Sequence, residues 1–180
     1  MPNTIELAGV HNISHSVKVP VVGEVSIELA LSKTNMTDLN KSVNTTFSTF
    51  EDTGVNLTIR FPKTYVVSDA EGQLCTGGQC EKKQAKLTMT VPLTLEAEVT
   101  YKLKKLGPIP VGLDGTPCFG PVLESSLGTA VVSGFGKTLD KYISEGVNKA
   151  ISEQHLFEKP LDEAFNEVLK KVQPHCNITA

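Results

Sequence analysis

The sequence predicts an α+β protein, in which a long curved antiparallel sheet over residues 4–105 packs on C-terminal amphipathic helices over residues 121–173. Residues of the first region alternate between apolar and polar with a period of two, which is typical of half-buried strands. Apolar residues recur at helical spacing in the second region. A bridge rich in Gly and Pro over residues 106–120 separates the two. A chain of 180 residues fits one domain, so we expect residues 1–180 to fold as a unit.

Two early segments alternate cleanly and predict half-buried strands. The apolar positions are Val25, Ile27, Leu29 and Leu31 in the first segment and Val55, Leu57, Ile59 and Phe61 in the second. Polar or small residues occupy most of the positions between them. Antiparallel strands with one face on a core and one in solvent produce this alternation.

The longest alternation runs over residues 87–103. Its apolar parity consists of Leu87, Met89, Val91, Leu93, Leu95, Ala97, Val99, Tyr101 and Leu103. At about 3.3 Å per residue the segment would span more than about 50 Å, far beyond a typical strand. Either a turn lies inside it, or the strand is long and bent. No Gly, Asn or Asp interrupts the run and only Pro92 offers a break, so we predict one long, strongly curved amphipathic strand.

Helical spacing begins after the bridge. Apolar residues recur in this way at Val122, Leu123, Leu127 and Val131, and again, after two glycines, at Leu139, Tyr142, Ile143, Val147 and Ile151. We expect a long amphipathic helix with a weak point at Gly134 and Gly136. A final helix, with Pro160 in its first turn, presents one apolar face made of Leu161, Phe165, Val168, Leu169 and Val172. Three helical pieces should therefore close the chain.

Composition and charge exclude several functional classes. Hydrophobic residues make up 39% of the chain and charged residues 21%, as in soluble globular domains. The net charge is −3, so the basic footprint of a nucleic-acid binder is missing. No apolar run reaches the roughly 18 residues that a transmembrane helix needs, so we expect no transmembrane segment. The N-terminus lacks the pattern of a signal peptide, so for an exported protein we expect that peptide to have been removed.

The asparagines indicate export. Six of the nine begin an N-x-S/T triplet without proline: Asn12, Asn35, Asn40, Asn44, Asn56 and Asn177. Chance would give roughly one or two of these N-glycosylation acceptors. A Thr-rich β protein that matches by accident is the alternative. We predict a secreted glycoprotein in which the cluster from Asn35 to Asn44 lies on an exposed loop or edge and Asn56 points outward from its strand.

The four cysteines suit the same oxidising compartment. Cys75 and Cys80 flank a Thr-Gly-Gly-Gln turn whose glycines permit positive φ, so a short disulfide-closed loop forms easily there. Cys118 would then pair with Cys176. Four cysteines allow three connectivities, and the sequence alone does not choose between them. A zinc site fits poorly, because this C-x4-C has no matching second pair and no nearby His.

We expect no catalytic, metal or cofactor site. The sequence has no G-x-S-x-G elbow, no H-E-x-x-H helix and no phosphate-cradling loop. His11 and His15 lie four residues apart on a predicted strand, about 13 Å at strand rise, which is too far to share one ion. The sequence therefore favours a protein that binds over an enzyme.

A curved sheet against a long helix can leave an apolar groove unfilled, and such a groove would bind a small lipid-like ligand. The parity of the long strand and the phase of the helix predict eight lining residues: Leu93, Leu95, Val99, Tyr101, Leu139, Tyr142, Ile143 and Val147. The alternative is that these residues simply fill a core.

The order of these elements resembles a known superfamily. The long strand over residues 87–103 leads through the bridge into the helix L-D-K-Y-I-S-E-G-V-N-K-A-I at residues 139–151. This pattern, over roughly residues 20–172, resembles the tubular lipid-binding superfamily that includes bactericidal permeability-increasing protein, takeout-like carriers and mite group 7 allergens. The resemblance implies a curled sheet wrapped around a long helix, an enclosed apolar ligand and a secreted protein.

Three functional hypotheses follow for a secreted, disulfide-bonded glycoprotein. In the first, the protein transports or sequesters a lipid-like or other small apolar ligand in the cavity between sheet and helix. In the alternative, it is an extracellular protein-interaction or host-modulating glycoprotein with a filled core, and its partner is another extracellular protein. A glycan-decorated hydrolase with an unrecognised site is a third hypothesis, which the motif search disfavours.

Overall fold

The computed structural model describes residues 2–41, 43–51 and 54–177 of the chain. The elements follow one another as β1 (Thr4–Leu7), β2 (His11–Val19), β3 (Gly23–Thr37), β4 (Asn44–Glu51), β5 (Gly54–Thr76), β6 (Gln79–Thr100), β7 (Leu103–Leu106), β8 (Ile109–Leu113), β9 (Cys118–Leu127), β10 (Val131–Ser133), α1 (Lys137–Gln154) and α2 (Glu158–Val172). The predicted α+β class, a long curved antiparallel sheet with C-terminal helices, is confirmed.

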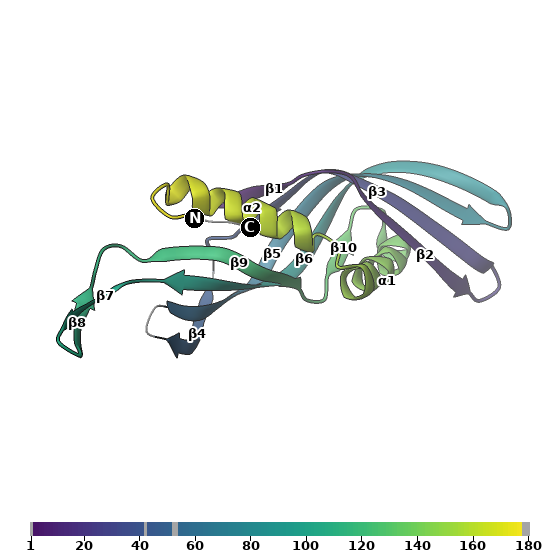
Figure 1. Cartoon of the computed structure of the whole chain (residues 1–180). Helices are drawn as coiled ribbons and strands as arrows, with labels where there is room; N and C mark the ends of the chain where they lie inside the picture. The colour runs from purple at the N-terminus through teal and green to yellow at the C-terminus, as the bar shows by residue number, and fades with distance from the viewer. Residues whose placement is uncertain (1, 42, 52–53, 178–180) are drawn as a thin grey trace.

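One antiparallel sheet of eight strands forms the body of the molecule (Figure 1). β3, β5 and β6 run side by side along its length. β2 and β1 pair with opposite ends of β3, and β4 pairs with the first part of β5. β9 and β10 pair with the remaining edge of β6. β7 and β8 form a separate two-stranded hairpin.

The long curved strand predicted over residues 87–103 is present as β6, although it ends at Thr100. Its partner β5 is equally long, with 23 residues against 22. A β-bulge interrupts their pairing between Phe61 and Thr64, opposite Pro92. The Thr64 hydroxyl donates a hydrogen bond of 2.6 Å to the carbonyl of Val91 beside this bulge. A bulge bends its strand and increases the local twist, which contributes to the arch seen in Figure 1.

The inward parity of β6 lies in the core, as its alternation indicated. Leu87, Met89, Val91, Leu93 and Leu95 are each at most 1% exposed. They join one apolar cluster with inward residues of β3 and β5 and with both helices. α1 lies beneath the arch of β2, β3, β5 and β6, and α2 lies along β9 over the other half of the sheet (Figure 1).

The helix predicted over residues 122–131 is wrong. This segment forms β9 and β10, and the helical part of the chain begins at Lys137 instead of residue 121. Pairing with β6 determines its structure, for Val122 lies opposite Ala97 and Val131 opposite Thr90. Two helices therefore close the chain instead of three helical pieces, and the bridge over residues 106–120 contains strand β8.

Side chains of both helices form hydrogen bonds to backbone groups along the outer edge of β9 and β10, where another strand would otherwise pair. Asn148 of α1 bonds to both the N–H and the carbonyl of Ala130. Asn166 of α2 accepts a hydrogen bond of 2.8 Å from the N–H of Val122. Polar side chains on otherwise apolar helix faces thus attach the helices to the sheet edge.

Candidate apolar ligand site

An apolar groove of about 340 Å³ lies between α2 and the half of the sheet made by β4, β5, β6 and β9. Its lining residues are Thr45, Phe47, Leu57, Ile59, Leu95, Ala97, Phe119, Gly120, Val122, Phe165, Val168, Leu169 and Val172. Thr45 alone among them carries a polar side chain. The volume falls within the range of small-molecule sites, about 300–1,000 Å³, and the lining suits an apolar ligand.

Strand register and helix phase bring these residues together. Ile59 of β5 pairs with Leu95 of β6, and Leu57 pairs with Ala97, so the four side chains share the inward face of the sheet. Val122 of β9 continues this surface, because it lies opposite Ala97. From the other side, α2 presents its apolar stripe at helical spacing through Phe165, Val168, Leu169 and Val172.

The mouth of the groove exposes large apolar side chains. Phe47 is 59% exposed, Phe119 47% and Val172 67%. Leu95 and Phe165, deeper in the groove, are at most 2% exposed. Apolar residues gathered at the rim of an apolar hollow indicate a surface that a ligand or a partner covers.

The C-terminal end of α2 is attached to the start of β9 by a disulfide and two hydrogen bonds. Cys118 and Cys176 form the disulfide. Gln173 accepts from the N–H of Phe119 at 2.8 Å and donates to the carbonyl of the same residue at 2.7 Å. The α2 wall of the groove is therefore held on the sheet at the end where the rim residues Phe119 and Val172 lie.

Asp162 places a carboxyl group on the side of α2 that faces Ser125 of β9. Burial raises the pKa of the Asp162 carboxyl above its ordinary value, and hydrogen bonding to Ser125 opposes that rise in pKa. Its Oδ1 atom is buried and has no hydrogen-bond partner among the described residues. The ionised carboxylate is therefore a destabilising feature of the folded state at neutral pH.

We expect the stability of the protein to fall as pH rises through the pKa of Asp162. The raised pKa means that the folded state holds more protons than the unfolded state between the two pKa values, so the free energy of unfolding decreases with pH in that window. Asp162→Asn should raise Tm at neutral pH and flatten this dependence, as thermal melts across pH would show. Asp69→Asn, at a solvated surface carboxylate, is the control. A lower Tm for Asp162→Asn at neutral pH would contradict this account.

The eight predicted lining residues do not surround one cavity. Leu95 lines the groove, and Leu93 lies in the core. Val99 and Tyr101 pack in a small cluster with Val55 and Leu57. The helix that faces Leu95 is α2, whereas the predicted helix residues Leu139, Tyr142, Ile143 and Val147 belong to α1, which packs on β2 and β10.

A second hollow touches two of the predicted helix residues and is too small for a ligand. Leu139 and Ile143 line it with Phe135 and with residues of β3, β5 and β6, and its volume is about 20 Å³. A space of this size holds about one water molecule. Leu139 and Ile143 therefore pack in the apolar core under α1, beside a hollow too small for a ligand.

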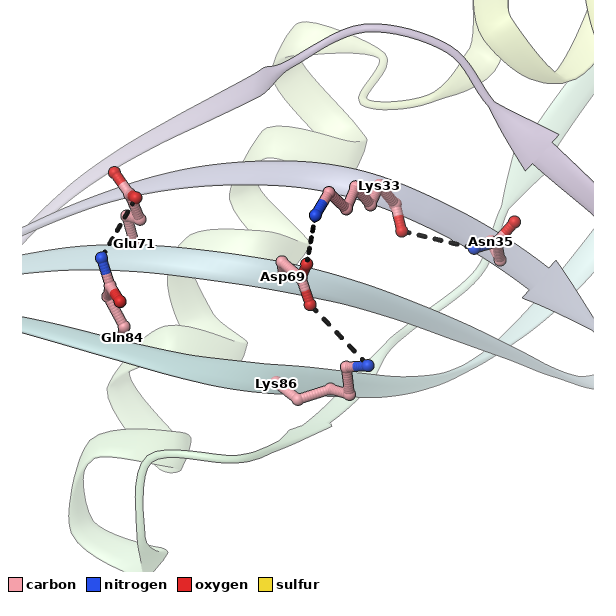
Figure 2. A network of polar contacts seen from close by, with 6 residues as sticks. All are labelled: Lys33, Asn35, Asp69, Glu71, Gln84 and Lys86. Atoms are coloured by element: carbon pink, nitrogen blue, oxygen red, sulfur yellow. Dashed lines mark hydrogen bonds and ion pairs between the residues drawn. The ribbon is translucent and has the colours of Figure 1, made fainter.

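The outer face of the sheet carries a polar network (Figure 2). Asp69 lies 3.7 Å from the amine of Lys33 and 3.8 Å from that of Lys86, and Gln84 donates to Glu71 at 3.2 Å. Figure 2 shows these side chains on β3, β5 and β6, with α1 on the other side of the sheet. Solvated ion pairs of this kind contribute about 0–1 kcal/mol, so the network marks a solvent-facing surface.

Both predicted disulfides are present, Cys75 with Cys80 and Cys118 with Cys176. His175 lies close to the second pair, and the ligand atoms of Cys118, His175 and Cys176 are within 4.8 Å of one another. Both sulfur atoms are bonded to each other, so this group offers no thiolate to a metal ion.

Sequence reasoning missed the α2 side and the rim of the groove. The stripe of α2 was recognised as an apolar helix face, but it was not matched to the strand residues it covers. The stripe runs on to the exposed Val172 at the end of the helix, which is the signal in the sequence nearest to the groove rim. No comparable signal marked Phe47 or Phe119, which are isolated aromatics in polar or turn-rich segments.

Neither a protein family nor the sequence of a characterised protein matches this chain. The fold, by contrast, matches solved structures. A crystal structure of lipopolysaccharide binding protein superposes with a TM-score of 0.52 at 13% sequence identity. The match covers 91% of this chain and 34% of the other, so this chain spans about a third of that protein's length. At this identity the match shows that the two share a fold.

The helices add one further observation. Within the described residues, no helix has the length and apolar character needed to cross a membrane.

Proposed function

We propose that the protein is an extracellular glycoprotein that binds a lipid-like ligand, whose acyl chain lies in the groove between α2 and the sheet. The observation that carries the proposal is the groove itself, with about 340 Å³ of space and a lining that is apolar except for Thr45. At about 0.8 kcal/mol per buried methylene, a chain segment of about six methylenes would supply roughly 5 kcal/mol before the costs of association.

The shared fold supports the same ligand class. Lipopolysaccharide binding protein, as its name says, binds lipopolysaccharide, a molecule that carries acyl chains. The groove of this chain offers an acyl chain an apolar surface. The open rim at Phe47 and Phe119 leaves a polar headgroup in solvent, so the lining selects for the apolar part of a ligand and not for one headgroup.

We assign the ligand contacts to Leu95 and to the other groove residues named above. Val99 and Tyr101 support this surface from one end, because Leu57 both lines the groove and packs with Val99. Leu139, Tyr142, Ile143 and Val147 serve the core of the other half of the sheet.

Secretion and glycosylation are supported by the accessibility of the acceptor sites. Asn12, Asn40, Asn44, Asn56 and Asn177 are exposed, and Asn35 is half-buried. Asn40 lies in the turn after β3 and Asn44 begins β4, a strand that pairs with β5 alone in the described sheet. Asn35 departs from the exposed loop or edge expected for the whole cluster, because it lies on β3 between β1 and β5. Two disulfides suit the oxidising environment outside the cytosol.

Native mass spectrometry of protein purified from its own source tests the proposal. We expect N-glycan masses that a glycosidase removes, together with an apolar adduct that organic extraction removes. A matched sample incubated with palmitate after extraction should regain one adduct per chain. Glycosylated protein that neither carries nor regains an adduct would favour the extracellular protein-interaction function, and protein without glycans would contradict the localisation.

A further inference from the structure

The β7–β8 hairpin ends in an apolar tip that no other described residue covers. Leu106 is 74% exposed, Ile109 and Val111 are 62% exposed, and Leu113 is 49% exposed. The two strands pair with each other, outside the eight-stranded sheet. Figure 1 shows the hairpin projecting from the end of the molecule opposite to the β2–β3 and β5–β6 turns. Large apolar side chains gathered on a projecting element indicate a partner surface.

The charge around this tip is opposite in sign to that of the whole chain. Lys102, Lys104 and Lys105 are exposed on and beside β7, and Asp114 is the one acidic residue in the segment 101–114. The whole chain has a net charge of −3. An apolar tip flanked by lysines matches an anionic lipid surface, because the side chains enter the interfacial region while the amines meet the headgroups.

The backbone of the hairpin argues against a protein partner that adds a strand to it. Pro110 in β8 and Pro108 in the turn have no N–H to donate, and a register shift between Lys104 and Lys105 distorts β7. The turn suits its residues, since Gly107 adopts a φ of 62° that a glycine accepts without strain and Pro108 fixes the next φ. The outer edge of the hairpin is therefore a poor template for strand pairing.

We propose that the β7–β8 hairpin docks the protein on anionic phospholipid bilayers, with Leu106, Ile109 and Val111 in the interfacial region and the three lysines against the headgroups. The hairpin connects β6 to β9, and Phe119 at the groove rim follows its second strand by a few residues. Docking would bring that end of the groove toward the bilayer. The inference goes beyond ligand binding, because docking does not require the groove to hold a lipid.

Vesicle flotation tests this inference, with equimolar phosphatidylserine and phosphatidylcholine against phosphatidylcholine alone. We expect the protein to float with the anionic vesicles and to detach as salt rises. Since each lysine near an anionic surface strengthens binding about fivefold, changing all three to Gln should weaken it roughly 100-fold. Leu106→Asp with Ile109→Asp should abolish it. Because these positions are exposed, the Tm of each variant should equal that of the parent protein.

A tryptophan reporter supplies an independent readout, because the sequence contains no Trp. Ile109→Trp should shift its emission to shorter wavelength on anionic vesicles. Val21→Trp, at the fully exposed turn between β2 and β3, is the matched control and should not shift.

Several results would overturn the docking inference: no flotation, equal flotation on neutral vesicles or at high salt, flotation of the double Asp variant, or a shift for Val21→Trp alone. Self-association that the double Asp variant abolishes, without vesicle binding, would assign the tip to a second copy of the chain instead. Palmitate binding in vesicle-free solution reports on the groove separately, so failure of either proposal leaves the other measurable.

Discussion

Ala97→Phe is expected to weaken ligand binding strongly while leaving the stability of the protein almost unchanged. Ala97 lines the groove opposite α2, and a phenyl ring added there would occupy space that the ligand needs. We expect affinity for a fluorescent fatty acid to fall at least about tenfold, which corresponds to about 1.4 kcal/mol. Tm should stay close to that of the parent protein, because the added ring enters an unfilled groove and buries apolar surface there.

Ala150→Phe is the matched control for this change. Ala150, on the buried face of α1, is 3% exposed, while Ala97 is 6% exposed, so the two alanines differ little in burial. They differ in the space beside them, because only Ala97 lines the groove. Overpacking a filled core costs about 1–3 kcal/mol, so Ala150→Phe should lower the free energy of unfolding and keep fatty-acid binding in the molecules that remain folded. Equal destabilisation by both variants, with no fatty-acid uptake by the parent, would show that the groove is filled in solution and would favour the protein-interaction function.

The disulfide between Cys118 and Cys176 should contribute more to stability than any other single cross-link in the described structure. It closes a loop with a sequence separation of 58, against 5 for Cys75 and Cys80. In the loop-entropy treatment these loops correspond to about 4 and about 2 kcal/mol. Changing Cys118 and Cys176 together to Ala should therefore lower the free energy of unfolding by about 2–5 kcal/mol, measured by urea denaturation.

The larger disulfide also holds the α2 wall of the groove, so its removal should weaken ligand binding as well. Gln173 keeps two hydrogen bonds to Phe119 at the same place, and these should limit the displacement of α2. Changing Cys75 and Cys80 to Ala is the control, because that turn lies at the far end of β5 and β6 from the groove. A larger loss of stability from the short loop than from the long one would contradict this ranking.

Sequence patterns are sufficient to identify the elements whose signals are local. The alternation over residues 87–103 identified the long amphipathic strand, and its inward residues from Leu87 to Val99 are buried. Tyr101 and Leu103 lie beyond the end of the strand and are half-buried. The glycine-rich turn between Cys75 and Cys80 indicated a disulfide that two adjacent strand ends then form. The period of 3.6 over residues 139–151 and 161–172 identified α1 and α2, because an amphipathic helix carries its own register.

The helix prediction over residues 122–131 failed because the pairing of β9 is irregular. Register shifts at Glu96 and Ala97 of β6 break the period of two in β9, where the buried positions are Gly120, Val122 and Ser125. Apolar Leu123 and Val131 face solvent at 51% and 68% exposure, which created a false helical pattern. Local spacing could not reveal that β6 and the side-chain amides of both helices form hydrogen bonds with the backbone of this segment.

Tertiary structure alone decided which helix faces which half of the sheet, and with it the position of the groove. The sequence placed strand residues such as Leu95 opposite the helix over residues 139–151. In the structure, His155 and Phe157 adopt left-handed φ values of 53° and 67° in the short connection from α1, and α2 packs on the other half of the sheet. A helix pattern specifies one apolar face but not the surface that will cover it. That choice depends on contacts between residues far apart in the chain, such as Asn166 with Val122 and Cys176 with Cys118.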